Sequence, residues 1–289
     1  MKNKNISVKG FMGLLLLFTA VISCQKMETP ALPSDYPTDD VTLPDGNLRF
    51  YISFDSTAPE DQQLNIRFSD SISGYPSFFP DPSITYGQGV SGTAMQGSTS
   101  KGFVQYVNAN DFGKATNFTI AFWMNVTLAQ KDKVNAEGVL AVSSTTNFWG
   151  NATVYVDHNN TKDTMDFKIH FANGTGDNWD FANYAGANGL KGMYDGQWHH
   201  IAFTYDAASK TGSLYVDGVL HDKKTGETIA FDGNDSKLIV GGFQQAASIT
   251  DTYGNNSWMA AFPGLIDNVR LYNTALSASD VAALYANKQ

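Results

Sequence analysis

The stretch Gly196-Gln-Trp-His-His-Ile-Ala-Phe-Thr-Tyr-Asp206, with Lys210-Thr-Gly-Ser-Leu-Tyr-Val-Asp-Gly-Val-Leu220 after it, decides the fold class. Side chains of the first part alternate between two faces, with Trp198, His200, Ala202 and Thr204 on one and His199, Ile201, Phe203 and Tyr205 on the other. A second short strand ends in Asp217-Gly218, a strong hairpin signal because both residues tolerate a positive φ. The chain is therefore predicted to fold as an antiparallel meander.

Segments of strand length recur on both sides of this meander. The predicted strands are 48–55, 64–68, 103–107, 118–126, 138–143, 151–157, 164–171, 237–242 and 265–272, and the Gly-, Ser- and Pro-rich stretch 69–102 is expected to wrap one edge. Strands at this spacing predict an all-β double sheet. One short C-terminal helix is expected at 277–285, because Ser277 can cap it with Asp280 three residues later.

Three segments, in order, carry a family resemblance: Phe118-Thr-Ile-Ala-Phe-Trp-Met-Asn125, the stretch from Gly196 to Gly218, and the ending Phe262-Pro-Gly-Leu-Ile-Asp-Asn-Val-Arg-Leu-Tyr-Asn-Thr-Ala-Leu-Ser-Ala-Ser-Asp-Val281. Together they resemble the laminin-G-like, concanavalin A-like jelly-roll family. The resemblance implies a two-sheet antiparallel jelly-roll sandwich from Asn47 to Tyr285, with Trp123 and Trp198 buried on core strands. The family includes binding modules, adhesion domains and relatives of glycosidases, so it does not determine the function.

The N-terminus has the pattern of a secretory signal. Three lysines precede the apolar run 11–22, which is too short to cross a bilayer comfortably. Val21-Ile-Ser-Cys24 resembles a bacterial lipobox, so residues 1–23 are predicted to be a lipoprotein signal peptide and Cys24 the lipidated residue. The alternative is an ordinary signal peptide with an incidental cysteine.

Residues 24–46 are polar, rich in proline and without apolar periodicity, which predicts a flexible tether before a domain at 47–289. The formal net charge is −9, and loss of residues 1–23 with their three lysines would make it −12. An acidic chain argues against a nucleic-acid partner, because nucleic acids require basic surface.

Catalytic patterns are weak. Glycosidase relatives of this fold carry two glutamates and an aspartate on one strand, whereas Glu28, Glu60, Glu137 and Glu227 lie on no common strand here. Asp163 and Asp166 are expected at a solvated hairpin end. Neighbouring His199 and His200 face opposite ways and cannot bind one metal together. The sequence therefore predicts a protein that is not an enzyme.

Calcium is the one cofactor that the resemblance suggests. Related domains often hold a structural Ca²⁺ near the motif that reads Gly264-Leu-Ile-Asp267 here, which implies Asp267 and Asp55 as ligands. The alternative is that both carboxylates accept hydrogen bonds from backbone amides at sheet corners.

Aromatic side chains among amides and carboxylates are typical of sugar binding. The candidate ligand contacts are Trp179, Tyr184, Asp177 and Asn178 in one loop, Tyr253, Trp258 and Asn255 in a second, and Trp149 in a third. Each aromatic could instead anchor its own loop. The resulting hypothesis is a lipid-anchored outer-membrane protein, on the periplasmic or cell-surface face, that binds polysaccharide or glycoconjugate without cleaving it.

Resemblance alone implies surface proteins of the Bacteroidetes type, with outer-membrane proteins as candidate partners and the lipid anchor as the only membrane contact. A protein-binding or adhesion module, and a glycosidase or polysaccharide lyase with an atypical site, are the alternatives. Two facing carboxylates about 5–9 Å apart in a cleft would indicate the enzyme.

Overall fold

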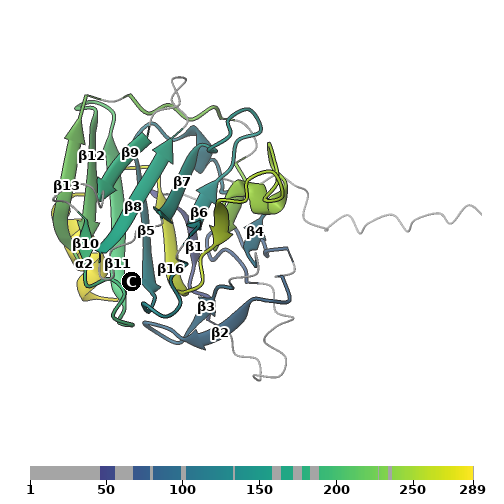
Figure 1. Cartoon of the computed structure of the whole chain (residues 1–289). Helices are drawn as coiled ribbons and strands as arrows, with labels where there is room; N and C mark the ends of the chain where they lie inside the picture. The colour runs from purple at the N-terminus through teal and green to yellow at the C-terminus, as the bar shows by residue number, and fades with distance from the viewer. Residues whose placement is uncertain are drawn as a thin grey trace, which may run out of the picture. The chain divides into compact units, whose positions relative to one another are not determined.

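Two antiparallel sheets stacked face to face make up the computed structural model (Figure 1), which confirms the predicted all-β sandwich. The structure describes residues 46–55, 68–78, 81–98, 102–132, 134–157, 164–171, 178–182 (backbone only), 189–226, 228–233 and 236–288. The predicted signal peptide, Cys24 and the predicted tether, except Gly46, lie outside these residues. No helix in the described ranges is long and apolar enough to cross a membrane.

The first sheet has the strand order β13-β12-β11-β5-β16-β3-β2, and β1 also pairs with β16. Its strands are β1 (Leu48–Ile52), β2 (Thr85–Gln88), β3 (Thr93–Gln96), β5 (Phe118–Asn125), β11 (His199–Asp206), β12 (Thr211–Val216), β13 (Val219–Thr225) and β16 (Leu265–Tyr272). The expected edge segment 69–102 therefore contains two strands. They form because β3 pairs with the buried strand β16, which the Gly-, Ser- and Pro-rich composition of the surrounding segment does not reveal.

The second sheet has the order β10-β8-β7-β6-β14-β4, with β15 on β6 and β9 on β8. Its strands are β4 (Val104–Tyr106), β6 (Ala136–Val142), β7 (Ala152–Asp157), β8 (Thr164–Phe171), β9 (Asn178–Ala182), β10 (Leu190–Lys191), β14 (Leu238–Val240) and β15 (Met259–Ala261). Among the described strands, β15 alone pairs in parallel. Short 3₁₀ turns, η2 (Phe112–Lys114) and η3 (Gln244–Ala247), lie in the connections.

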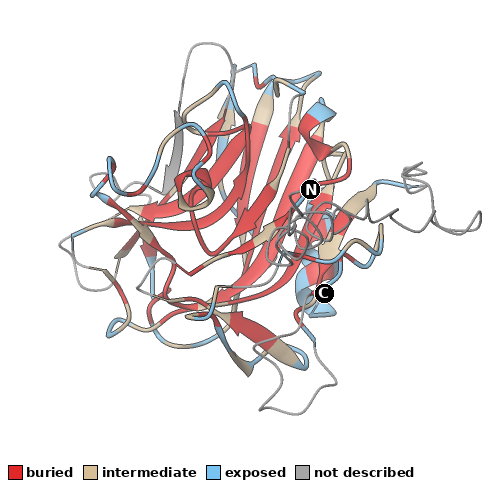
Figure 2. Cartoon of the chain, turned by 90° about the vertical axis from the view of Figure 1, so that its right-hand side faces the viewer, coloured by how far each residue is buried: buried red, intermediate tan, exposed pale blue. Residues whose placement is uncertain are grey.

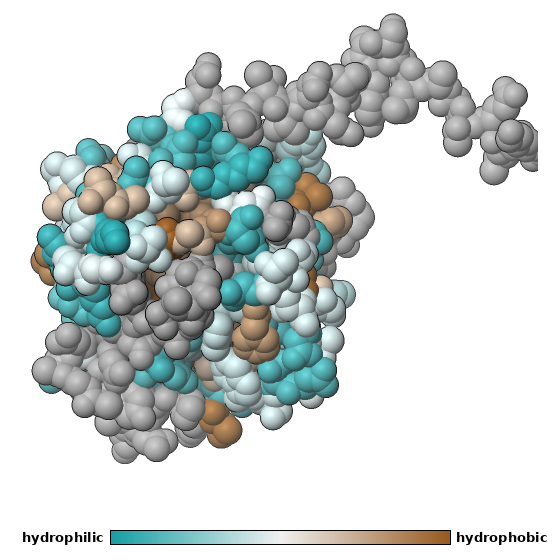
Figure 3. Space-filling view, turned by 90° about the horizontal axis from the view of Figure 1, so that it is seen from above, coloured by the Kyte–Doolittle hydropathy of each residue, from teal (hydrophilic) through white to brown (hydrophobic). Residues whose placement is uncertain are grey.

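The core fills the space between the sheets, where Figure 2 shows the strands as almost continuously buried. Phe118 is at its centre, with its ring 5.7 Å from Phe171 of the second sheet and 5.9 Å from Phe203 of the first. Each such side chain contributes roughly 1.5–3 kcal/mol by leaving water. On the outside, as Figure 3 shows for one face, hydrophobic residues are interspersed with hydrophilic ones.

The central meander forms as predicted. β11 pairs with both β5 and β12, and its residues Ile201, Phe203 and Tyr205 face the core. Asp217 and Gly218 have φ values of 50° and 76°, so the turn before β13 has the expected left-handed conformation.

The C-terminal helix α2 (Ala278–Ala286) covers part of the outer face of the first sheet. Ser277 caps it and Asp280 completes the capping box, as the sequence predicts. Val281 and Leu284 are buried against this sheet, whereas Tyr285 is 39% exposed. The helix therefore leaves an open aromatic side chain at its C-terminal end.

Candidate functional site

Two of the predicted aromatic loops meet on the outer face of the second sheet. The rings of Trp149 and Trp258 lie with centroids 5.6 Å apart, although the loops are distant in the sequence. Trp258 is 40% exposed, and Trp149 is half-buried. Trp149 stacks on Tyr155 at 5.7 Å and lies 3.9 Å from the ring of His170. We call these four side chains the aromatic platform.

Strand alternation places the base of the platform. Tyr155 on β7 and His170 on β8 sit between core residues of their strands and so point away from the core. The Tyr155 hydroxyl and His170 Nε2 are 2.6 Å apart. Burial, followed by the charge of Lys168, lowers the pKa of His170 to about 3, so this imidazole is neutral at pH 7. The base is therefore rigid and uncharged.

The loop that carries Trp149 is held by two buried amides of η3. Gln244 Nε2 donates to the carbonyl oxygens of Asn147 and Phe148 at 2.8 and 3.0 Å, and Gln245 Nε2 donates to Phe148 O at 2.7 Å. Both glutamines are at most 2% exposed. Trp149 is thus presented from a loop with fixed backbone, which lowers the entropy lost when a ligand binds.

A charged pair lies beside the platform. Lys168 is directly opposite Tyr155 in the β7–β8 register, and its Nζ is 2.7 Å from Asp157 Oδ2. An ammonium and a carboxylate side by side supply both a donor and an acceptor for hydroxyl groups. The combination of a flat aromatic surface with paired polar groups is the composition that sugar recognition requires.

Other predicted ligand contacts have different positions. Tyr253 is 5% exposed, and its hydroxyl accepts from the Phe243 N–H at 3.1 Å, so it anchors its loop and is not an accessible contact. Asn255 is exposed but its Nδ2 donates to Asp251 Oδ1 at 2.7 Å, closing the same loop. Asn178 and Trp179 were expected in a loop, but they are in β9, where they pair with His170 and Ile169. Asp177 and Tyr184 lie outside the described residues.

The proposed calcium ligands both hold the turn between β2 and β3. Asp267 Oδ2 accepts from the Val90 N–H at 2.8 Å, and Asp55 Oδ1 accepts from the Thr93 N–H at 2.9 Å. Burial, with Asp55 nearby, raises the pKa of Asp267 to about 7. Two adjacent carboxylates fit a calcium ion that takes its remaining ligands from carbonyls and water. No group of three or more His, Cys, Asp or Glu in the described ranges could hold a metal.

Of the described acids, Glu137 is buried toward the core, whereas Asp157 and Asp166 lie directly opposite each other in the β7–β8 register. Glu137 is the one glutamate within the described ranges; it is opposite the core residue Val156, is 1% exposed, and burial raises its pKa to about 8. Asp166 is fully buried within β8, so the expected solvated hairpin end is wrong for this residue. The histidine pair is structural, since His199 bonds Asp195 and Asp217 whereas His200 packs on Trp123.

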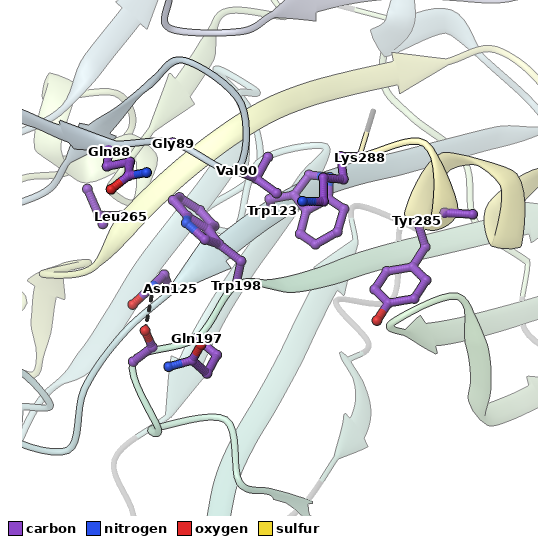
Figure 4. A pocket seen from close by; sticks show the side chains of 12 residues that line it. Gln88, Gly89, Val90, Trp123, Asn125, Gln197, Trp198, Leu265, Tyr285 and Lys288 are labelled. Atoms are coloured by element: carbon purple, nitrogen blue, oxygen red, sulfur yellow. Dashed lines mark hydrogen bonds between the residues drawn. The ribbon is translucent and has the colours of Figure 1, made fainter.

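A pocket that sequence reasoning missed lies on the outer face of the first sheet (Figure 4). It is a pocket of about 780 Å³ next to the C-terminal end of α2. Trp123 is 3% exposed, as expected, but Trp198 is only half-buried and lines the pocket. The expected burial of Trp198 is therefore wrong, because α2 covers only part of this sheet face.

Solved structures with this architecture include several binding domains, all of low sequence identity. Domain 4 of AbnA, a GH43 extracellular arabinanase from Geobacillus stearothermophilus in complex with arabinotriose, has 17% identity and a TM-score of 0.53, covering 83% of this chain and 98% of that one. The binding domain of Paraclostridial Mosquitocidal Protein 1 has 16% identity and a TM-score of 0.56, covering 84% and 52%. The botulinum neurotoxin serotype G binding domain has 14% identity and a TM-score of 0.56, covering 84% and 51%.

The chain thus spans almost all of the arabinanase domain and about half of each toxin domain, and these likenesses establish the fold. A search of curated proteins found no match. A laminin G family model described as the concanavalin A-like lectin/glucanases superfamily matches residues 98–282, more than half of the chain. With the two-sheet fold and its three sequence motifs, this match shows that the chain belongs to the concanavalin A-like lectin/glucanases superfamily.

Proposed function

We propose that this domain is a non-catalytic carbohydrate-binding module and that a glycan chain lies across the aromatic platform. The observation that carries the proposal is the meeting of Trp149 and Trp258, with 40% of Trp258 left exposed. A sugar ring can place its apolar face on the open indole of Trp258. Its hydroxyls can then reach the Lys168–Asp157 pair.

The polar neighbours favour a glycan over a protein partner. Protein interfaces bury a broad apolar centre from which lysines and acids are depleted, whereas this platform is small and adjoins an ion pair. The arabinotriose in the AbnA domain 4 structure gives one sugar to test first. Cleavage is not proposed, because Glu137, the one glutamate within the described ranges, is buried and directed toward the core.

The cellular role that we propose is capture. A lipid on Cys24 and the 24–46 tether would hold the domain at the outer membrane, where it could retain polysaccharide or glycoconjugate for other outer-membrane proteins. The N-terminal sequence supports this proposal.

The test is a glycan array followed by calorimetry with the best-bound oligosaccharide. Trp258→Ala is expected to weaken binding by about 1–3 kcal/mol, the scale of burying one large side chain, and Trp258→Phe to retain most of the affinity. Leu220→Ala is the matched control, since Leu220 is 48% exposed on β13 of the other sheet. Equal affinity for all three variants would overturn the proposed site, and cleavage products would indicate an enzyme.

A further inference from the structure

The floor of the pocket on the first sheet includes Trp123, which lies in the middle of one row of residues across three strands. His200 on β11 is in register with Trp123 on β5, which is in register with Asp267 on β16. Directly opposite residues share a face, so all three side chains are on the outer side. Trp123 stacks on Tyr285 of α2 with centroids 5.6 Å apart and ring planes 22° from parallel. Trp123 therefore gives the pocket an aromatic floor, which is held by the neighbouring strands and by Tyr285 of α2.

One wall of the pocket is the turn between β2 and β3, which contributes Gln88, Gly89 and Val90. Asp267, which neighbours Trp123 in this row but does not line the pocket, fixes this wall through its hydrogen bond from the Val90 N–H. Glycine is required at position 89, because a β-carbon there would lie 2.5 Å from Ser91 O and 2.6 Å from Asp267 Oδ2. The wall is thus held in place before any ligand arrives.

Three side-chain amides and one lysine provide most of the polar lining: Gln88, Asn125, Gln197 and Lys288. Asn125 Nδ2 donates to Gly196 O at 2.8 Å, which leaves its Oδ1 as an acceptor (Figure 4). The side-chain amides of Gln88 and Gln197 make no hydrogen bond with any described residue. Each offers a donor and an acceptor, the pairing that a hydroxyl group matches.

We infer that this pocket is a second oligosaccharide-binding site, separate from the aromatic platform. Half-exposed Trp198 gives a sugar ring a surface to stack on, and the amides bond its hydroxyls. No carboxylate lines the pocket among the described residues, which disfavours a cation, and the amide lining disfavours a lipid chain. Its volume of about 780 Å³ lies within the roughly 300–1,000 Å³ of small-ligand sites.

The two sites lie on the outer faces of opposite sheets, so one domain could engage two glycan chains at once. Two engaged sites raise the avidity for a polymer without any new contact. The second site does not depend on the platform, because no residue is shared between them.

The experiment titrates the full-length protein with neutral hexasaccharides of glucose, mannose, xylose and arabinose, followed by calorimetry and tryptophan fluorescence. At least one sugar is expected to bind with an affinity that Trp198→Ala lowers about tenfold to a hundredfold. Gln197→Ala is expected to lower it less. Leu220→Ala is expected to leave it unchanged, whereas Trp258→Ala reports on the aromatic platform.

Gln197 is exposed, so its variant keeps the test valid if Trp198→Ala fails to fold. If every sugar that binds is lost in Trp258→Ala and unaffected at Trp198 and Gln197, the second site is overturned and the platform stands. If binding depends on Trp198 and Gln197 alone, the platform fails and the second site stands. No binding by any of the four sugars overturns the second site.

Discussion

Asp267 on β16 accepts a hydrogen bond from the Val90 N–H at 2.8 Å, and this contact joins the sheet to the turn that forms one wall of the pocket. The carboxylate is fully buried. A single side chain thus links the stability of the first sheet to the shape of the pocket.

Asp267→Asn is expected to lower stability, because its amide nitrogen would face a backbone N–H; a buried donor without an acceptor costs about 1–3 kcal/mol. The variant should also lose a pH dependence. Burial raises the pKa of Asp267 from 3.8 to about 7, so the folded state holds a proton that the unfolded state releases. Wild-type stability from this group is present below pH 3.8 and is lost as pH rises to about 7.

Urea unfolding at pH 5 and pH 8 checks both statements. Between pH 5 and pH 8, the free energy of unfolding of the wild type is expected to fall by up to about 2–3 kcal/mol more than that of Asp267→Asn. Asp251→Asn is the comparison variant, since Asp251 lies in a distant exposed loop. Parallel pH profiles for the wild type and Asp267→Asn would contradict the protonation argument.

Calcium is expected to restore the stability that is lost when Asp267 ionises at high pH, because a cation stabilises ionised Asp267 beside Asp55. At pH 8, millimolar CaCl₂ should raise Tm and a chelator should lower it again. Asp55→Asn should abolish the calcium response while leaving the fold intact, because its side-chain oxygen can still accept from the Thr93 N–H. A Tm that is the same with calcium and with chelator would remove calcium from this site.

The sequence predicts correctly those elements whose pattern is local. Its predictions fail where pairing with a distant segment determines the structure. The Asp217-Gly218 turn and the Ser277 cap are specified by their own residues, and both form as predicted. β2 and β3 lie in a Gly-, Ser- and Pro-rich segment, and they become strands by pairing with each other and, through β3, with β16.

The same difference governs the sites. Composition identified Trp149 and Trp258 as candidates, but nothing local indicates that their rings meet. The family resemblance implied that Trp198 is buried on a core strand, but its exposure depends on how far α2 extends over the outer face of the sheet. The signal that could have identified it is the neighbouring Gln197, an amide before a tryptophan at a strand entrance.

Tyr253→Phe tests the loop that carries Trp258. The change removes the acceptor of the buried Phe243 N–H and is expected to cost about 1–3 kcal/mol of unfolding free energy. Tyr285→Phe is the matched control, since the Tyr285 hydroxyl makes no hydrogen bond with a described residue. Thermal unfolding compares the two variants. If Tyr253→Phe is as stable as Tyr285→Phe, the anchoring role is wrong.

Cys24→Ala tests the proposed anchor. The thiol is the only one in the chain, so its loss removes any thioether lipid without disturbing a disulfide. We expect the variant to move from the membrane fraction to the soluble fraction and to lose the mass of the lipid in intact-protein mass spectrometry. Ser23→Ala, which keeps a small residue before the cysteine, should remain in the membrane. If Cys24→Ala also stayed in the membrane fraction, something other than this cysteine would hold the protein at the membrane. Capture through a lipid anchor on Cys24 would then be wrong.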